Sequence, residues 1–208
     1  MTMSPISAAV VALVLLTVFG LLGFVWRAWL QRRRTGSTGF HGISGNIGSA
    51  EWVAGLGFVI SLIVAVVGPV LQLSGVITPL PVLHGDAIQI AGIMLALLGV
   101  VLTVWAQLDM GDSWRVGVDE SETTALVHTG MFGRVRNPIY TAMLTFDVGI
   151  ALLTPNFVTI AGLILAVAAL ELQMRRVEEP HLLGKHGDAY RGYKASVGRF
   201  IPGVGLLR

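Results

Sequence analysis

The chain has 208 residues, of which 54% are hydrophobic and only 12% are charged. A water-soluble domain of this size needs more polar surface, so this composition excludes a soluble enzyme or binding domain and requires lipid to cover much of the molecule. The net charge of +2 is not gathered into a basic stripe with interleaved aromatic residues, so no nucleic-acid partner is expected. The absence of cysteine excludes disulfides and thiolate-bound zinc.

Three long apolar runs occupy the first half of the chain, from Pro5 to Leu30, from Trp52 to Ile77 and from Ala87 to Leu108. An α-helix rises about 1.5 Å per residue, so each run is long enough to cross a hydrocarbon core of roughly 30 Å. The runs therefore predict three membrane-spanning helices. Pro69, within the second run, is expected to kink its helix.

Two shorter apolar runs follow a polar segment, from Ile139 to Leu153 and from Phe157 to Leu172. The residues Thr154-Pro155-Asn156 between them predict a tight helical hairpin. Each arm is near or below spanning length, and we expect the arms to extend into the flanking polar residues. Pro180 is expected to end the second arm, and a separate helix with a glycine interruption is expected from His181 to Tyr193.

The basic residues indicate how the chain is threaded through the membrane. With five spans and the N-terminus outside, all 14 Lys and Arg residues fall on one side, which the positive-inside rule makes the cytoplasm. We therefore predict an all-α, polytopic membrane protein with five transmembrane helices, placed in a bacterial plasma membrane. It is expected to be a single membrane domain over residues 1–208, with a three-helix scaffold in residues 1–108 and the hairpin, cytoplasmic tail and site in residues 109–208.

A polar stripe lies on the first arm of the hairpin. Asn137, Tyr140, Leu144 and Asp147 are spaced at i, i+3, i+7 and i+10, so they share one helix face, which should contact protein and not lipid. Asp147 lies well inside an apolar run, where an ionised carboxylate is costly. Two interpretations stay open for it: a carboxyl group satisfied by a neighbouring helix, or a member of a pocket.

A second polar cluster follows the second arm. Glu171, Arg175 and Glu178 are spaced at i, i+4 and i+7, which places them on one face, either as a solvated row of ion pairs or as part of a site. Because Arg175 and Glu178 emerge at the same membrane depth as Asn137 and Tyr140, we expect the two clusters to meet. Together they suit a ligand that is zwitterionic at one end and apolar at the other.

The loop before the hairpin offers a further ligand-binding segment. Leu126 to Phe132 combines an apolar pair with a glycine turn, and its backbone N–H groups can serve a ligand, although such a loop is ordinary by itself. The five histidines form no i, i+4 pair on a predicted helix, so no metal site is expected.

Several motifs occur in order between Met110 and Pro202. They are Leu126-Val127-x-x-Gly130-x-Phe132-x-x-x-Arg136-Asn137-Pro138-x-Tyr140, then Arg175-x-x-Glu178-Glu179-x-x-Leu182, Gly187-x-x-Tyr190-x-x-Tyr193 and Arg199-Phe200-Ile201-Pro202. This set resembles the isoprenylcysteine carboxyl methyltransferase family. The related phospholipid N-methyltransferases share the general plan.

The resemblance implies that S-adenosylmethionine is the cofactor and that a lipophilic small molecule or lipid enters from the bilayer as the methyl acceptor. It implies catalytic roles for Arg175 and Glu178, with Arg175 orienting the acceptor. The residues that it assigns to cofactor binding are Thr124, Ala125, Leu126, Val127, Gly130, Phe132, Asn137, Pro138, Ile139, Tyr140 and Glu178.

The sequence departs from the family at Asn137, where a histidine usually precedes the proline. An amide hydrogen-bonds but does not titrate, which argues against proton transfer at this position. The acceptor group stays open among a carboxylate, a thiol, an amine and a phenol, and the oligomeric state stays open as well.

Two other functions stay open. A membrane reductase of the sterol-reductase type carries a similar motif pattern but binds NADPH, usually with more helices. A non-catalytic membrane subunit or transporter would distribute polar residues through several spans, whereas here they gather at one end.

Overall fold

The computed structural model describes residues 2–40, 42–115 and 126–206. Its α-helices are α1 (Pro5–Gly20), α2 (Arg27–Thr35), α3 (Ala50–Leu73), α4 (Asp86–Met110), α5 (Pro138–Leu153), α6 (Phe157–Gln173) and α7 (Glu179–Ser196). Short 3₁₀ helices occur at Pro81–Leu83, Gly111–Ser113 and Gly130–Gly133. These ranges contain no β-strand, so the predicted all-α class is confirmed.

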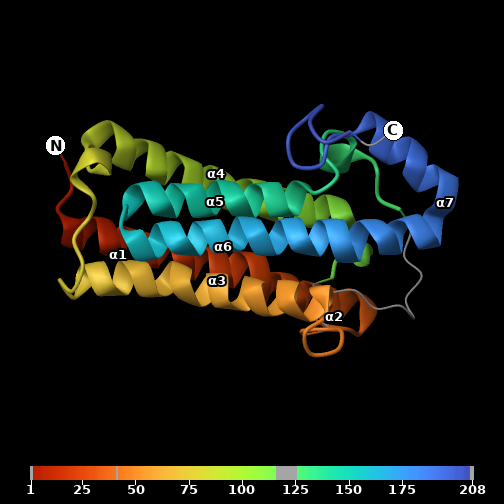
Figure 1. Cartoon of the computed structure of the whole chain (residues 1–208), viewed down its shortest axis with the longest axis horizontal. Coiled ribbons are helices and arrows are strands. Elements are labelled where there is room, and N and C mark those ends of the chain that lie inside the picture. Colours follow the sequence, from red (N-terminus) through yellow and green to blue (C-terminus); the bar gives the residue numbers. More distant parts are fainter. Residues whose placement is uncertain (1, 41, 116–125, 207–208) are drawn as a thin grey trace.

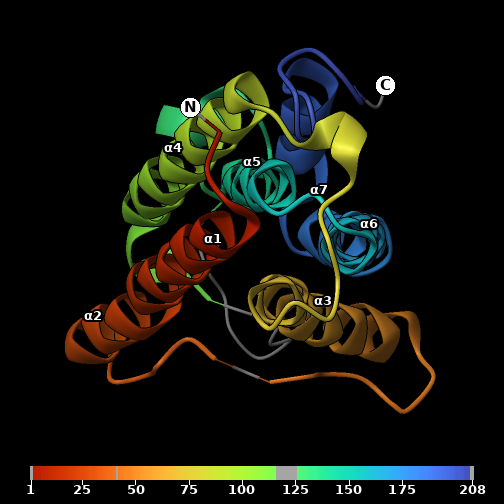
Figure 2. The same cartoon turned by 90° about the vertical axis from the view of Figure 1, so that its left-hand side faces the viewer.

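The helices that run along the long axis of the molecule are α1, α3, α4, α5 and α6 (Figure 1). Viewed end-on, α5 lies among α1, α4 and α6 (Figure 2). Within the described ranges, four continuous helical stretches are long and apolar enough to cross a membrane, and α5 is a shorter apolar helix. The first and last described residues lie toward opposite ends of the bundle, as an odd number of passes requires. The protein is therefore a polytopic integral membrane protein.

The two arms of the hairpin end differently. α5 has only 16 residues, because Asn137 and Thr154 at its two ends have non-helical backbone angles. α6 continues through a π-helical turn, Met174–Glu178, directly into α7. The expected extension into polar residues is thus found for the second arm and not for the first.

Neither Pro69 nor Pro180 ends a helix. α3 continues through Pro69 to Leu73. Pro180 lies in the first turn of α7, contrary to the expectation that it ends the second arm, because the missing N–H of proline is tolerated in a first turn. The predicted glycine interruption is confirmed at Gly187, whose φ of 50° favours glycine.

A second π-helical turn, Leu21–Trp26, joins α1 to α2, so that one continuous helix extends from Pro5 to Thr35. Such turns interrupt the regular helical hydrogen bonding and frequently occur at functional sites. Here Nε2 of Gln107 on α4 donates a hydrogen bond to the carbonyl oxygen of Gly23 at 2.8 Å. This bond links the first helix to α4.

Small residues let α4 and α5 approach closely. A Cβ atom at Gly149 would lie 2.4 Å from the backbone nitrogen of Ala96, and one at Gly99 would lie 2.6 Å from the backbone nitrogen of Phe146. Helices in membranes commonly associate through such faces, because small side chains bring the backbones together. The close contact fixes α5 against the rest of the bundle.

Gly149→Ala is expected to lower the stability of the protein by about 2 kcal/mol, because the added methyl group must displace the α4 backbone. Gly20→Ala is the matched control, since a Cβ atom there meets nothing within 4 Å. Thermal unfolding in detergent compares the two variants. Equal melting temperatures would contradict the close approach of α4 and α5.

Buried amide groups close one end of the bundle. Nδ2 of Asn156 donates to Oε1 of Gln72 at 3.1 Å, and Nε2 of Gln72 donates to the carbonyl oxygen of Pro5 at 3.0 Å. Gln89 on α4 donates to the carbonyl oxygen of Met3 at 3.2 Å and accepts from its N–H at 2.8 Å. These bonds hold the hairpin turn, α3, α4 and the N-terminus together at this end of the bundle. The polar clusters predicted from the sequence lie at the other end.

Candidate functional site

The described lysines and arginines gather at one end of the bundle, which carries α2, α7 and the adjoining loops (Figure 1). We call this the basic end. A cavity of about 190 Å³ lies there, lined by residues from the α1–α2 helix, α3, α4, α5, α6 and α7. The apolar lining residues from the bundle helices include Phe24, Ala54, Phe58, Met110, Met143 and Leu170. The polar lining residues include Arg136, Asn137, Tyr140, Gln173, Glu178, His181, Tyr190 and Tyr193.

Tyr140 and Glu178 join the two polar clusters at the cavity. The hydroxyl of Tyr140 on α5 donates a hydrogen bond to Oε1 of Glu178, the last residue of the π turn before α7. Nε2 of Gln173 donates to the same oxygen at 3.4 Å. The expectation that the two clusters meet is confirmed.

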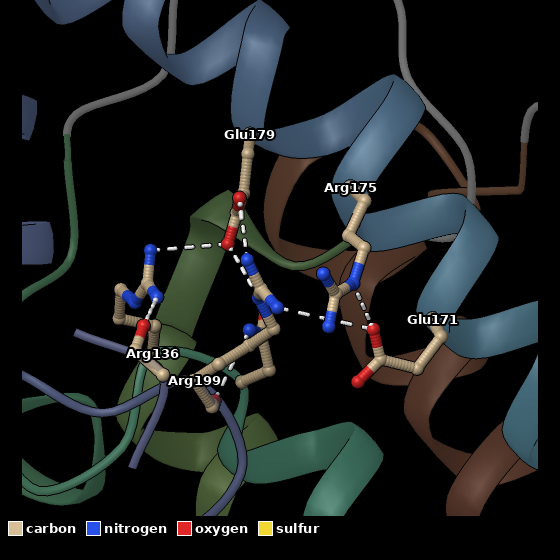
Figure 3. A network of polar contacts seen from close by, with 7 residues as sticks. Arg136, Glu171, Arg175, Glu179 and Arg199 are labelled. Carbon is tan, nitrogen blue, oxygen red and sulfur yellow. Dashed lines mark hydrogen bonds and ion pairs between the residues drawn. The ribbon is translucent and has the colours of Figure 1, made fainter. Parts of the chain in front are cut away.

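Glu179, the next residue, holds two arginines that are distant in the sequence (Figure 3). Its Oε1 lies 3.0 Å from Nη1 of Arg136 and 2.7 Å from Nε of Arg199, and its Oε2 accepts from Nη2 of Arg199 at 3.0 Å. The two-pronged contact with Glu179 raises the pKa of Arg199, because it stabilises the charged guanidinium. Both arginines are less than a tenth exposed, so Glu179 is the anchor of a buried ion-pair network.

The tail after α7 returns to the segment that precedes α5. Val135 and Gly198 form an isolated parallel bridge, and the N–H of Arg136 donates to the carbonyl oxygen of Gly198 at 2.8 Å. No larger residue fits at Gly198, because a Cβ atom there would lie 2.1 Å from the carbonyl oxygen of Ile201. The tail and the Glu179 network therefore fix the start of α5 and with it the position of Tyr140.

Asn137 is bonded to the same tail. Its N–H and its Nδ2 donate to the carbonyl oxygen of Arg199 at 3.1 and 3.2 Å. The side chain is buried and lines the cavity, but one of its donors is used to hold the tail. At this position the amide thus has a structural role that needs no proton transfer.

The loop before the hairpin contributes Phe132 to the cavity. Gly130 has a φ of 59°, and a Cβ atom there would lie 2.4 Å from Oδ2 of Asp109, which also accepts from the N–H of Met131 at 2.8 Å. The hydroxyl of Tyr193 on α7 donates to the carbonyl oxygen of Phe132 at 2.6 Å. These bonds fix the loop between α4 and α7 and place the Phe132 side chain in the lining.

Comparison with known proteins agrees with these motifs. Residues 87–189 match the family model described as PEMT, phospholipid methyltransferase. The predicted resemblance is confirmed. Among solved structures, the fold is similar to that of the eukaryotic intramembrane Ras methyltransferase ICMT, isoprenylcysteine carboxyl methyltransferase, with a TM-score of 0.58 and 21% sequence identity. The similarity covers 92% of this chain and 66% of that one, so the chain spans less than two thirds of the solved structure. No curated protein matches the sequence.

Only some of the residues that the methyltransferase resemblance assigns to cofactor binding line the cavity. Those that line the cavity are Leu126, Val127, Phe132, Asn137, Pro138, Ile139, Tyr140 and Glu178. Gly130 is absent from the lining and supports the loop through its contact with Asp109. Thr124 and Ala125 lie outside the described residues.

Arg175 is not brought to the cavity. Its Nε pairs with Glu171, and its side chain is 59% exposed (Figure 3). The prediction that Glu171, Arg175 and Glu178 share one face is confirmed for the paired Glu171 and Arg175 and is wrong for Glu178, which accepts from Tyr140 instead. Glu178 ends the π turn Met174–Glu178, which has more residues per turn than an α-helix and so shifts its side chain to another face. The catalytic role of Arg175 stays a prediction that no contact in the structure supports.

Asp147 also lies apart from the cavity. It lines a separate void of about 10 Å³ between α3, α5 and α6, together with Ser61 and Thr159. The predicted stripe on α5 therefore divides, with Asn137 and Tyr140 in the cavity and Asp147 facing neighbouring helices.

Sequence reasoning missed several lining residues. Tyr190 and Tyr193 were recognised as a motif but given no role, although their i, i+3 spacing on a helix indicates a shared face. Phe24, Phe58 and Gln107 belong to helices that were predicted to be scaffold. For these three there was no sequence signal, because their participation depends on how the helices pack.

Proposed function

We propose that the protein is an S-adenosylmethionine-dependent methyltransferase that acts at the membrane on a lipophilic acceptor. One observation supports this above the others: eight residues that the motifs assign to the cofactor line a single cavity, in which Tyr140 is bonded to Glu178. The phospholipid methyltransferase match over residues 87–189 includes both residues.

The chemistry of the lining fits this cofactor. The carboxylate of Glu178 offers a negative charge to an ammonium or sulfonium group, and Leu126, Val127 and Phe132 offer apolar surface to an aromatic base. The bundle helices add an apolar wall that suits a lipophilic acceptor. The lining therefore has a polar part and an apolar part, as a reaction between a charged cofactor and a lipid requires.

Bound S-adenosylmethionine supplies an activated methyl group on a sulfonium centre. Methyl transfer disperses that positive charge, so the protein has mainly to align the reactants and exclude water. In the proposed mechanism Glu178 and Tyr140 hold and orient the cofactor. The apolar residues of α3, α4 and α5 keep water from the acceptor.

We further propose that the basic end faces the cytoplasm, as the positive-inside rule predicts for the Lys and Arg residues gathered there. The water-soluble cofactor then enters from the cytoplasm, and the acceptor enters from the bilayer. Placement in a bacterial plasma membrane stays a prediction from the sequence.

Isothermal titration of the purified protein tests the proposal. S-adenosylmethionine and its demethylated product are expected to bind, and NADPH is not. Binding of NADPH alone would overturn the proposal in favour of a reductase. Binding of neither compound, with an unchanged cellular phenotype for Glu178→Ala, would favour a non-catalytic subunit. A labelled-methyl assay over lipophilic thiols, acids, phenols and amines then identifies the acceptor.

A further inference from the structure

One face of α2 is held by the protein. Nη2 of Arg27 donates to the carbonyl oxygen of Gly111, and Nε2 of Gln31 donates to the carbonyl oxygen of Asp112 at 2.7 Å. Arg27 and Gln31 are buried and are four residues apart, so they share this face. Nη1 of Arg34, seven residues after Arg27, lies 3.7 Å from Oδ1 of Asp112 on the same side. These contacts fix the orientation of α2 against the segment that follows α4.

The opposite face of α2 carries Trp29, Arg32 and Arg33, and we call it the outer face. These residues are spaced at i, i+3 and i+4, and all three are exposed. The guanidinium of Arg33 lies over the indole ring of Trp29, 4.1 Å from its centroid. Within the described ranges, neither Arg32 nor Arg33 forms an ion pair with a carboxylate. Two guanidinium groups on this face therefore have no protein anion as partner.

The length of the first helix places the outer face at the membrane surface. The continuous helix Pro5–Thr35 has 31 residues, which rise about 46 Å, roughly 16 Å more than a hydrocarbon core of about 30 Å. Counted from Pro5, the last turns of this helix therefore extend beyond the core, where the lipid phosphates lie. Leu22 and Val25, just before α2, are apolar and exposed, as expected of residues that contact acyl chains.

A tryptophan beside two arginines at this depth favours one kind of partner. Tryptophan is enriched where acyl chains meet headgroups, and a guanidinium can form two parallel hydrogen bonds with a phosphate. In a zwitterionic lipid an ammonium group offsets the phosphate charge, whereas in an anionic lipid the charge remains. The charge of the outer face is therefore complementary to an anionic headgroup.

We propose that the outer face of α2 binds an anionic phospholipid, whose phosphate contacts Arg32 and Arg33 and whose glycerol region packs against Trp29. Its acyl chains continue along the exposed apolar residues that precede α2. None of the three residues of the outer face lines the cavity, so this lipid is distinct from the methyl acceptor and the inference goes beyond the proposed function.

Native mass spectrometry of the full chain in detergent tests the proposal. Dioleoyl phosphatidylglycerol and dioleoyl phosphatidylcholine have the same acyl chains and differ in net charge. The affinity for each lipid is measured for the wild type, for Arg32→Gln/Arg33→Gln and for Arg176→Gln/Arg191→Gln. The last variant is the matched control, because it removes two exposed arginines elsewhere at the basic end.

The wild type is expected to bind phosphatidylglycerol about tenfold more tightly than phosphatidylcholine. Arg32→Gln/Arg33→Gln is expected to lose this preference, and the control variant is expected to keep it. Equal losses in the two double variants would overturn the proposal, because net charge and not the outer face would then determine the preference.

Soluble sn-glycerol 3-phosphate distinguishes a lipid from a free anion. It carries the phosphate without acyl chains, so at equal concentration it is not expected to displace phosphatidylglycerol. Complete displacement would show an anion site and would overturn the assignment to a lipid.

Wild-type protein in nanodiscs provides a measurement that needs no variant. Phenylglyoxal modifies accessible guanidinium groups, and Arg32 and Arg33 are expected to react several times more slowly in phosphatidylglycerol than in phosphatidylcholine, relative to the exposed Arg191. Equal relative rates would overturn the proposal even if the variants do not fold. No cofactor is used in these experiments, so their outcome is independent of the proposed function.

Discussion

Glu178→Ala is expected to weaken the binding of S-adenosylmethionine about 100-fold. The substitution removes a carboxylate from the cavity and leaves the hydroxyl of Tyr140 without its acceptor. Losing a hydrogen-bonded charged group of this kind costs about 2–3 kcal/mol, which corresponds to roughly 30- to 150-fold in affinity. Isothermal titration of the purified variant measures the change.

Two variants serve as controls for Glu178→Ala. Asp188→Ala removes an exposed carboxylate that pairs only with Arg191 in the described structure, and it is expected to leave the affinity unchanged. Glu178→Gln keeps an acceptor for Tyr140 but removes the charge, so it separates the contribution of charge from that of position. Wild-type affinity in Glu178→Ala would refute the placement of the cofactor.

Glu179→Ala is expected to destabilise the protein by about 3–5 kcal/mol, because it leaves the buried guanidinium groups of Arg136 and Arg199 without their common carboxylate. The tail after α7 should then detach from the segment before α5. Thermal unfolding in detergent measures the stability. Limited proteolysis reports whether residues after Ser196 become accessible.

Glu171→Ala is the matched control for Glu179→Ala. Glu171 pairs with the exposed Arg175 and approaches Nη1 of Arg199 only to 3.9 Å, so its loss is expected to cost less than about 1 kcal/mol. If both substitutions lower the melting temperature equally, Glu179 is not the anchor of the network.

The bundle was predictable because its signals are local in the sequence. Apolar length placed the helices to within a few residues, and the turn at Thr154-Pro155-Asn156 was recognisable from its composition. The meeting of Tyr140 with Glu178 also followed, since both residues had to emerge at the same end of the hairpin.

The parts that could not be predicted depend on non-local packing or on irregular helix geometry. The spacing of apolar and polar residues in a sequence does not reveal a π turn. Here such a turn places the side chains of Glu178 and Arg175 on different faces of the helix. The pairing of Glu179 with Arg136 and Arg199 requires the tail to return to α5, which no spacing indicates. The sequence does not distinguish Gln107 from any other amide in an apolar helix, because its hydrogen bond to Gly23 depends on how α4 packs against the first helix.

The shortness of α5 bears on how the cavity sits in the membrane. Its 16 residues rise only about 24 Å, which is roughly 6 Å less than a hydrocarbon core. A helix of this length does not reach both surfaces of the hydrocarbon core, so either the bilayer thins around α5 or an end of α5 lies below the membrane surface. Asn137 and Tyr140, at the start of this short helix, line the cavity, so the cavity belongs to the end of α5 that this mismatch affects. Under the proposed function, a lipid could then present its reactive group at the cavity while its chains remain among other lipids, which lowers the cost of extracting it.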